Sequence, residues 1–176
     1  MNGQGPPFYG KYRGIVTDNN DKLGRLGRLR AKVQDVYGDK ESGWAMPSTP
    51  YAGKGVGLFL IPPKDALVWI EFEHGDPDYP IWTGCFWGDK SEVPAKDSNP
   101  EIKVLKTGIG TITVNDSQDA SGITIESTKG TTKDMKIVID KNGIQIINGQ
   151  KVQGQDVGVK ISGSTVSING NGLEVS

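Results

Sequence analysis

Residues 101–176 contain no aromatic side chain, and they also lack proline, arginine, histidine and cysteine. The segment holds 12 isoleucines, 8 valines and 8 threonines, interrupted by 11 glycines. β-Branched side chains suit the pleated surface of a sheet and glycine permits turns, so this composition predicts many short strands. Aromatic side chains bury roughly 150 to 250 Å² each and carry much of an ordinary core. A segment without them is expected to share a thin aliphatic core with other copies of itself.

The aliphatic residues of this segment fall at alternate positions, as in Ile123 and Ile125 or Ile137 and Ile139. Each strand therefore offers one narrow apolar face. Strands are predicted at 110–114, 123–126, 137–140, 144–147, 157–161, 166–168 and 173–175, separated by turns at Gly108, Gly122, Gly130, Asn142-Gly143, Asn148-Gly149, Gly154, Gly163 and Asn169-Gly170. Three chains wound together would cover these faces. We predict an intertwined trimeric β-helix over 101–176, a triangular prism filled with Ile and Val; a monomeric or dimeric adhesin-like sheet is the alternative.

The chain as a whole is nearly neutral, with a formal net charge of −1. This argues against a dedicated nucleic-acid-binding protein, which usually carries a basic excess. Cys85 is the single cysteine, so an internal disulfide is excluded, and its place in an aromatic segment predicts a buried side chain. The first residues contain neither a basic nor an apolar region, and no apolar run approaches the roughly 18 residues of a membrane span. We therefore predict no signal peptide and synthesis in the cytoplasm.

Every tryptophan, tyrosine and phenylalanine lies within residues 1–88, which have a different pattern. Strands are predicted at 11–18, 26–36, 56–61, 67–73 and 80–87. In the second of them Leu29, Ala31 and Val33 alternate with basic residues, as in a strand with one buried face. The stretch 39–50 is predicted to be a loop whose Trp44 closes one end of the core. Five strands without helical periodicity predict a small closed barrel over 10–88.

Several residues of this first unit could suggest a catalytic or metal site. Glu71, Glu73 and Asp76 are acidic neighbours, but alternation places Glu71 and Glu73 on the outer face of their strand, opposite the apolar residues. We interpret them as a solvated strand face. His74 has no histidine or cysteine partner nearby in the sequence, so a metal site is not predicted.

Two further features also have simple structural interpretations. The glycine-rich segment 53–57 lacks the Gly-Lys-Ser/Thr spacing of a phosphate-binding loop and is predicted to be a turn between strands. The four arginines lie between Arg13 and Arg30, and a solvated barrel face or a subunit contact explains them as well as a nucleic-acid groove would. We predict no catalytic, cofactor-binding or metal-binding residues, and no cofactor.

The order of short motifs in the first unit is specific. Seven blocks follow one another: Gly14-Ile15-Val16, Gly27-Arg28-Leu29-Arg30-Ala31-Lys32-Val33, Ser42-Gly43-Trp44-Ala45, Pro50-Tyr51-Ala52-Gly53, Leu67-Val68-Trp69-Ile70-Glu71-Phe72-Glu73, Gly75-Asp76-Pro77 and Pro80-Ile81-Trp82-Thr83-Gly84. Residues 10–88 thereby resemble the oligonucleotide/oligosaccharide-binding (OB) barrel of phage baseplate assembly protein V. The same barrel occurs in the VgrG spike of type VI secretion and in extracellular contractile injection systems. One departure is Lys64-Asp65-Ala66, where the family usually has Gly-Asp-Glu, and it affects a turn only.

The resemblance implies the central spike of a contractile machine, whether a phage tail, a secretion apparatus or an extracellular injection particle. Its parts would be an N-terminal extension (1–9), the five-stranded OB barrel (10–88), a linker with a turn of helix (89–100) and a trimeric β-helix needle (101–176). The barrel would sit on a trimeric hub protein, and the needle would meet the target cell envelope transiently. The role is predicted to be mechanical and not enzymatic, because 89–100 cannot hold the lysozyme domain that some spikes carry at this place.

The C-terminal residues 170–176 lack the His-x-His apex with which some phage spikes bind a metal ion. We therefore expect a separate tip protein of the PAAR-repeat kind, and a place for the chain in an assembled tail or tail-like particle. Two alternatives stay open. An OB barrel can bind single-stranded nucleic acid by stacking bases on aromatic side chains, although the aromatic residues here, apart from Trp69, are predicted to face inward. A cell-wall hydrolase would need paired carboxylates in a cleft.

Overall fold

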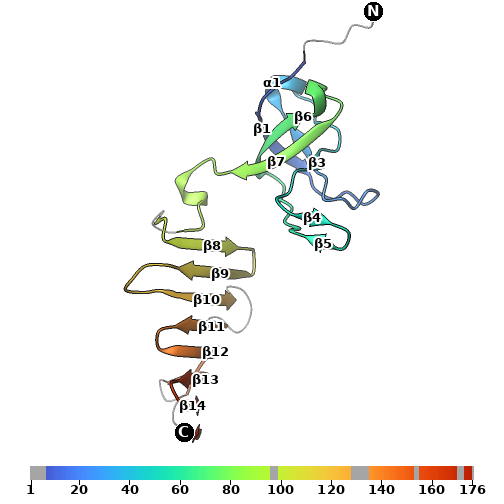
Figure 1. Ribbon diagram of the computed structural model, residues 1–176. Coiled ribbons are helices and arrows are strands. Elements are labelled where there is room, and N and C mark those ends of the chain that lie inside the picture. Colours follow the sequence, from blue (N-terminus) through green and yellow to red (C-terminus); the bar gives the residue numbers. More distant parts are fainter. Residues whose placement is uncertain (1–6, 96–98, 128–134, 153–154, 170–172, 176) are drawn as a thin grey trace, which may run out of the picture. The chain divides into compact units, whose positions relative to one another are not determined.

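The computed structural model describes residues 7–95, 99–127, 135–152, 155–169 and 173–175. The chain divides into two compact units, Met1–Lys90 and Ser91–Ser176. Strands dominate both (Figure 1). The helices of the described residues are one short α-helix, α1 (Gln34–Tyr37), and two 3-10 turns, η1 (Glu73–Gly75) and η2 (Lys90–Glu92); none is long and apolar enough to cross a membrane. The fold is all-β, which confirms the prediction from composition.

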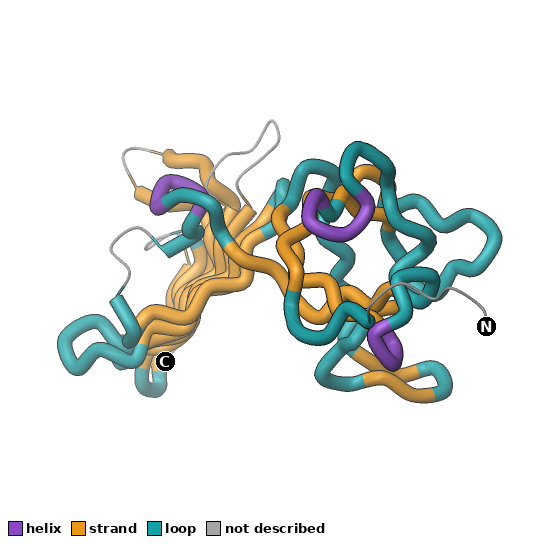
Figure 2. The backbone as a smooth tube through the Cα atoms, turned by 90° about the horizontal axis from the view of Figure 1, so that it is seen from above, coloured by secondary structure: helices purple, strands orange, loops and turns teal. Residues whose placement is uncertain are grey.

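The first unit is built on a five-stranded sheet. Its strands, in spatial order, are β2 (Arg30–Lys32), β1 (Tyr12–Asp18), β6 (Leu67–Phe72), β7 (Pro80–Phe86) and β3 (Met46–Pro47). All neighbours are antiparallel except β3 and β7, which are parallel. Isolated backbone bridges join Leu29 to Ala45 and Lys32 to Glu41, and they bring the two edges of the sheet together. Figure 2 accordingly shows the strands and loops of this unit in a ring.

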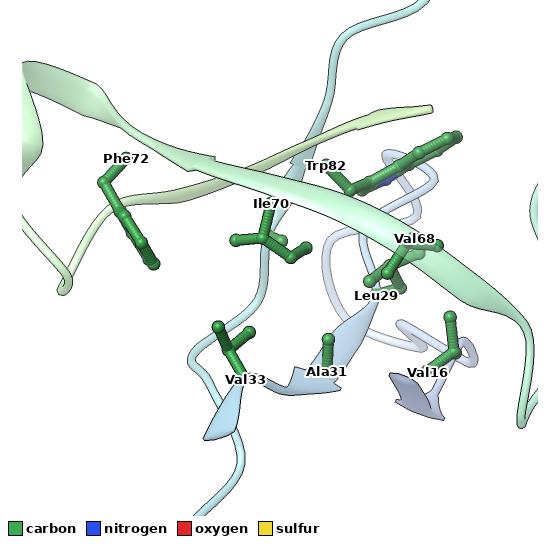
Figure 3. Packing of buried hydrophobic residues seen from close by; sticks show 9 residues of the cluster. Val16, Leu29, Ala31, Val33, Val68, Ile70, Phe72 and Trp82 are labelled. Atoms are coloured by element: carbon green, nitrogen blue, oxygen red, sulfur yellow. The ribbon is translucent and has the colours of Figure 1, made fainter. Parts of the chain in front are cut away.

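The centre of this ring is filled by apolar side chains. Val68, Ile70 and Phe72 alternate along β6 and face inward, and Trp82 of β7 lies at one end of the cluster (Figure 3). Trp82 donates a hydrogen bond from Nε1 to the carbonyl oxygen of Gly27 at 3.1 Å, which satisfies its polar atom inside the core. The other members are Val16, Leu29, Ala31, Val33 and Ala45, each at most 1% exposed. The alternation of Leu29, Ala31 and Val33 was therefore a correct guide to the core.

Two of the five predicted strands differ in the structure. The strand predicted at 26–36 is confined to Arg30–Lys32, because residues 34–37 form α1, in which Tyr37 N bonds Val33 O at 2.9 Å. The prediction at 56–61 is wrong beyond Gly57: only β5 (Val56–Gly57) forms there, paired with β4 (Ala52–Gly53) in a separate hairpin. The fifth strand of the barrel is β3, within the stretch 39–50 that was predicted to be a loop.

Two single-residue predictions in this unit are also wrong. Trp44 does not close the core; it is half-buried, and the guanidinium groups of Arg28 and Arg30 lie 6.0 and 5.0 Å from its ring centre. Cys85 is exposed, not buried. The physical reason is that the pairing of β7 with β3 ends at Trp82, so Cys85 has a neighbouring strand on one side only.

The second unit is a single eight-stranded antiparallel sheet. Its strands are β8 (Ile102–Lys106), β9 (Gly110–Asn115), β10 (Gly122–Ser127), β11 (Met135–Asp140), β12 (Gly143–Val152), β13 (Gln155–Ser162), β14 (Thr165–Ile168) and β15 (Leu173–Val175). Each pairs with the next along the chain, so the sheet is a meander (Figure 1). All seven predicted strands are present. Strand β8 was not predicted, and the expected turns at Gly130, Gly154 and Gly170 lie outside the described residues.

Seen in the view of Figure 2, the strands of this sheet follow one another with little rotation. Sheets of many strands usually twist, and nearly flat ones are typically stabilised by stacking against another surface or by ladders of side chains. All the strand pairs found here form within one chain. The winding of three such chains into a β-helix therefore stays a prediction.

Candidate functional site: the aliphatic face of the second unit

One face of the eight-stranded sheet carries two continuous rows of aliphatic side chains. Residues directly opposite each other on antiparallel strands share a face, and the register places Ile125 beside Ile112 on one side and Ile137 on the other. One row contains Val114, Ile123, Ile139, Ile144, Ile161 and Val166; the other contains Leu105, Ile112, Ile125, Ile137, Ile146, Val159, Ile168 and Leu173. We call this surface the aliphatic face.

The aliphatic face is open to solvent in the single chain. Its isoleucines range from 38% exposed at Ile137 to 49% at Ile146, and Leu173 is 55% exposed. Soluble monomers rarely expose an apolar surface this continuous, and such surfaces mark interaction sites. The face is also slightly hollowed, with a cavity of about 530 Å³ lined in part by Ile125, Ile137 and Ile146. The arrangement is suited to burial against an equally apolar partner.

The opposite face of the same sheet is mixed and mostly polar. Across its centre the register aligns Thr113, Thr124, Val138, Gln145 and Lys160. Alongside them Glu126 is paired directly with Lys136. Opposite charges on facing strand positions are mildly favourable, and such a face is compatible with water. The two faces therefore differ enough to define which one a partner covers.

Glycines allow close contact between the strands. A Cβ atom added to Gly158 in β13 would lie 1.9 Å from the carbonyl oxygen of Ile146, and one added to Gly143 would lie 1.9 Å from that of Ile161. Gly143 also has a φ of 119°, which side chains rarely permit. Glycine is required at both places for the register that aligns the aliphatic rows.

Charged residues next to the aliphatic face are paired. Lys103 of β8 stands opposite Val114, in the same row as the aliphatic residues, and its ammonium group binds the carboxylate of Asp116. Between β12 and β13, Lys151 Nζ lies 3.7 Å from Asp156 Oδ1. The sequence pattern did not identify Lys103 or the neighbouring Leu105, because β8 mixes lysines with aliphatic residues.

The acidic residues considered in the first unit do not form a catalytic cluster. Glu71 accepts a hydrogen bond from Lys11 Nζ at 2.5 Å, and Glu73 and His74 are exposed in η1. Asp76 accepts a bond from the backbone N of Asp78 at 3.0 Å. No group of three or more potential metal ligands occurs among the described residues. Within the glycine-rich segment 53–57, Lys54 and Gly55 form the predicted turn, and the other residues belong to β4 and β5.

Arg28 and Arg30 have separate acidic partners. Arg28 Nε donates to Asp21 Oδ2 at 2.7 Å, and this bond, with that from the backbone of Gly24, holds the pKa of Asp21 at about 2, although burial opposes the shift. Arg30 pairs with Glu41 at 3.3 Å. These two arginines are therefore engaged with acidic residues of the barrel surface.

The first unit also carries aromatic side chains outside its core. Trp69 of β6 and Phe86 of β7 have ring centres 4.6 Å apart, and the guanidinium group of Arg13 lies 5.8 and 5.5 Å from them. The outward position of Trp69 agrees with the sequence, but the prediction that the other aromatic residues face inward is wrong for Phe86. A shift in register between Trp69 and Ile70 allows Phe86 to reach the outer face.

Comparison with known proteins assigns a family to each unit. Residues 12–87 match the type VI secretion system/phage-baseplate injector OB domain, and residues 102–174 match the phage baseplate V C-terminal trimerisation domain. An injector OB domain followed by a trimerisation domain defines the class of protein. Together the two ranges take in most of the chain, which thus consists of an injector OB domain and a phage baseplate V trimerisation domain; this confirms the resemblance found in the sequence.

Two spike proteins of Pseudomonas aeruginosa PAO1 are similar in sequence. Type VI secretion system spike protein VgrG4b is 36% identical over 74 residues, which cover 40% of this chain and 9% of the relative. Type VI secretion system spike protein VgrG5 is 35% identical over 85 residues, which cover 44% of this chain and 11% of the relative. The chain thus spans about a tenth of these relatives. The matches support a spike role in a phage baseplate or type VI secretion apparatus.

Proposed function

We propose that three copies of this chain form the central spike of a contractile injection machine and that the spike pierces a cell envelope mechanically. One observation carries the proposal: the aliphatic face is exposed in one chain and lies in a segment that matches a trimerisation domain. In the spike the three aliphatic faces meet on a common axis as the inside of a prism, and the polar faces point outward.

The energy of this association can be estimated from the exposed fractions. Fully burying an Ile or Leu side chain contributes about 1.5 to 3 kcal/mol. The residues of the face that are 38 to 55% exposed in the single chain therefore gain about 1 kcal/mol each when a partner covers them. Summed over the face, this is on the order of 10 kcal/mol per chain before the entropy of association is subtracted. This gross gain is of the same order as the roughly 8 kcal/mol net that a micromolar dissociation constant requires.

The same architecture supports a mechanical role without an enzyme activity. Hydrogen bonds run between neighbouring strands through the whole eight-stranded sheet. A prism of three such sheets transmits force along its axis when a sheath contracts and drives the tube forward. In this proposal the barrels sit on a trimeric hub at the end of the tube, a PAAR-type protein covers the opposite end, and the spike contacts the target envelope briefly.

The test is the position and stoichiometry of the chain in assembled particles. Electron cryomicroscopy is expected to show three copies on the axis at the distal end of the tube, and the purified chain is expected to have three times its mass of 18.9 kDa. A monomer in solution, or a position elsewhere in the particle, contradicts the proposal. The tip protein is tested separately: particles assembled without it should end bluntly, and a complete pointed apex made by this chain alone contradicts that part.

One observation favours a second function, the binding of single-stranded nucleic acid. The outer stack of Arg13, Trp69 and Phe86 offers aromatic surface next to a positive charge, and such surfaces can stack bases. We expect no salt-dependent binding of single-stranded DNA at micromolar protein, because the chain carries a net charge of −1. Binding that weakens in Arg13→Ala would favour the second function. Lysis of purified peptidoglycan would likewise contradict the non-enzymatic role.

A further inference from the structure

The first unit has a projecting apolar arm, residues 51–60, which consists of the β4–β5 hairpin and the three residues after it (Figure 1). The arm is held by few bonds, such as Leu58 N to Tyr51 O at 2.9 Å. Its apolar side chains are unusually exposed, at 74% for Phe59, 61% for Tyr51, 54% for Val56 and 50% for Leu58. A two-stranded hairpin is at best marginally stable in water by itself, so the arm is expected to pack against something in the assembled protein.

A hollow lies between the arm and the sheet. Its volume is about 880 Å³, and it is lined by arm residues together with Leu26, Met46, Trp82 and Thr83. Leu26 is 55% and Met46 44% exposed, so the hollow is itself an open apolar surface. Lys54 is the single charged residue of the arm. Each barrel therefore presents an apolar arm and an apolar hollow. Two different but matching surfaces on each copy are what a head-to-tail contact that closes in a ring requires.

The connection to the second unit limits which partner is available. Residues 87–101 join β7 to β8. About 15 residues reach at most about 50 Å when extended and roughly 20 Å on average when flexible. A unit of about 90 residues has a radius of gyration of about 12 Å. In a trimer held together by the second units, the three barrels are consequently neighbours, each at an effective concentration in the millimolar range around the others.

This effective concentration favours a second copy over a separate protein as the occupant. A contact with an intrinsic dissociation constant of about 1 mM is substantially formed between tethered barrels. A separate partner at micromolar concentration would have to bind the same surface about a thousandfold more tightly to compete. We propose that in the trimer the arm of each chain packs into the hollow of the next chain around the axis. The proposal rests on the trimer of the proposed function.

The experiment measures the protection of a cysteine placed in the arm of the full chain. Cys85 is exposed and is first replaced by serine. Leu58→Cys then reports on the arm, and Leu23→Cys, at a position 98% exposed and outside the arm, is the matched control. In the trimer, maleimide should label the cysteine at 58 at least tenfold more slowly than the cysteine at 23. Adding Phe59→Glu should restore fast labelling at 58 while the mass stays that of a trimer.

A second comparison separates contact between chains from packing within one chain. Ile137→Asp, on the aliphatic face of the second unit, is introduced to dissociate the trimer. In the resulting monomer the tenfold difference should disappear, and only the smaller difference expected from the exposure of Leu58 (50%) and Leu23 (98%) should remain. Equal rates in a sample whose mass is trimeric overturn the proposal and leave the trimer intact. Slow labelling at 58 in a confirmed monomer also overturns it, because the arm would then be covered by its own chain. Protection that appears only when a separate hub protein is added assigns the arm to that partner instead.

Discussion

Two neighbouring residues of β11 provide a sharp test of the trimer. Ile137 lies on the aliphatic face, between Ile125 and Ile146, and is 38% exposed in the single chain. Val138 lies on the opposite face, between Thr124 and Gln145, and is less exposed than Ile137. If the chain acted as a monomer, Ile137→Asp would therefore be the milder substitution. If three aliphatic faces meet, the order reverses.

The size of the effect follows from what each aspartate would meet. Ile137→Asp forfeits the roughly 1 kcal/mol that covering the remaining exposed part of Ile137 contributes. It also places an unpaired carboxylate in an apolar interior, at an effective penalty of several kcal/mol per ion. The substitution occurs three times in one trimer, in a single layer where the charges repel. The total destabilisation of the trimer by Ile137→Asp is on the order of 10 kcal/mol or more. The aspartate of Val138→Asp would face water, so this substitution should change stability by about 1 kcal/mol.

Light scattering coupled to size-exclusion chromatography measures the result directly. The parent chain and Val138→Asp should elute with three times 18.9 kDa, and Ile137→Asp should elute with the mass of one chain at micromolar concentration. Circular dichroism of the first unit serves as a folding control, because the substitution lies in the second unit. A trimeric Ile137→Asp beside a dissociated Val138→Asp would refute the assignment of the inner face.

Three other predictions concern individual contacts. Gly158→Ala forces a Cβ to within 1.9 Å of a neighbouring carbonyl oxygen and should destabilise the second unit by about 1 to 3 kcal/mol in thermal unfolding; Gly108→Ala, with open space at its Cβ, is the control. The pKa of Asp21 falls from 3.8 to about 2 on folding, so its stabilising effect is complete above about pH 4 and lost toward pH 2; Asp21→Asn should lower the melting temperature at pH 6 but not at pH 2. Burial, followed by the charges of Asp78 and Asp76, raises the pKa of Tyr37 from 10.0 to about 12. Stability should therefore decline between pH 10 and 12, and Tyr37→Phe, which lacks this titration, should lose less over that interval.

The pattern of the sequence was a reliable guide where structure depends on local periodicity. Alternate isoleucines from Ile123 to Ile146 identified both the strands and their apolar face, because side chains in a strand alternate whatever the neighbouring strand is. The sequence pattern was unreliable where two paired strands are far apart in the chain. Strand β3 is two residues long and parallel to β7, and neither property leaves a local signal.

The individual errors have the same origin. Cys85 is exposed because β7 is paired with β3 only as far as Trp82. Phe86 points outward because the register of β6 and β7 shifts by one residue between Trp69 and Ile70. The exposed arm was not recognised because Val56 to Ile61 is as apolar as a core strand. A single sequence cannot distinguish an apolar segment that its own chain buries from one that stays exposed.

The meander order of the second unit has a consequence for its dimensions. Neighbouring strands lie about 4.8 Å apart, so eight strands extend for about 35 Å along the direction in which they are stacked, slightly more than the roughly 30 Å hydrocarbon core of a bilayer. Because each strand bonds only to the strands before and after it in the chain, one added or deleted hairpin changes this length by about 10 Å and leaves the remaining register intact. The second unit is thus a structure whose length can be altered in regular steps.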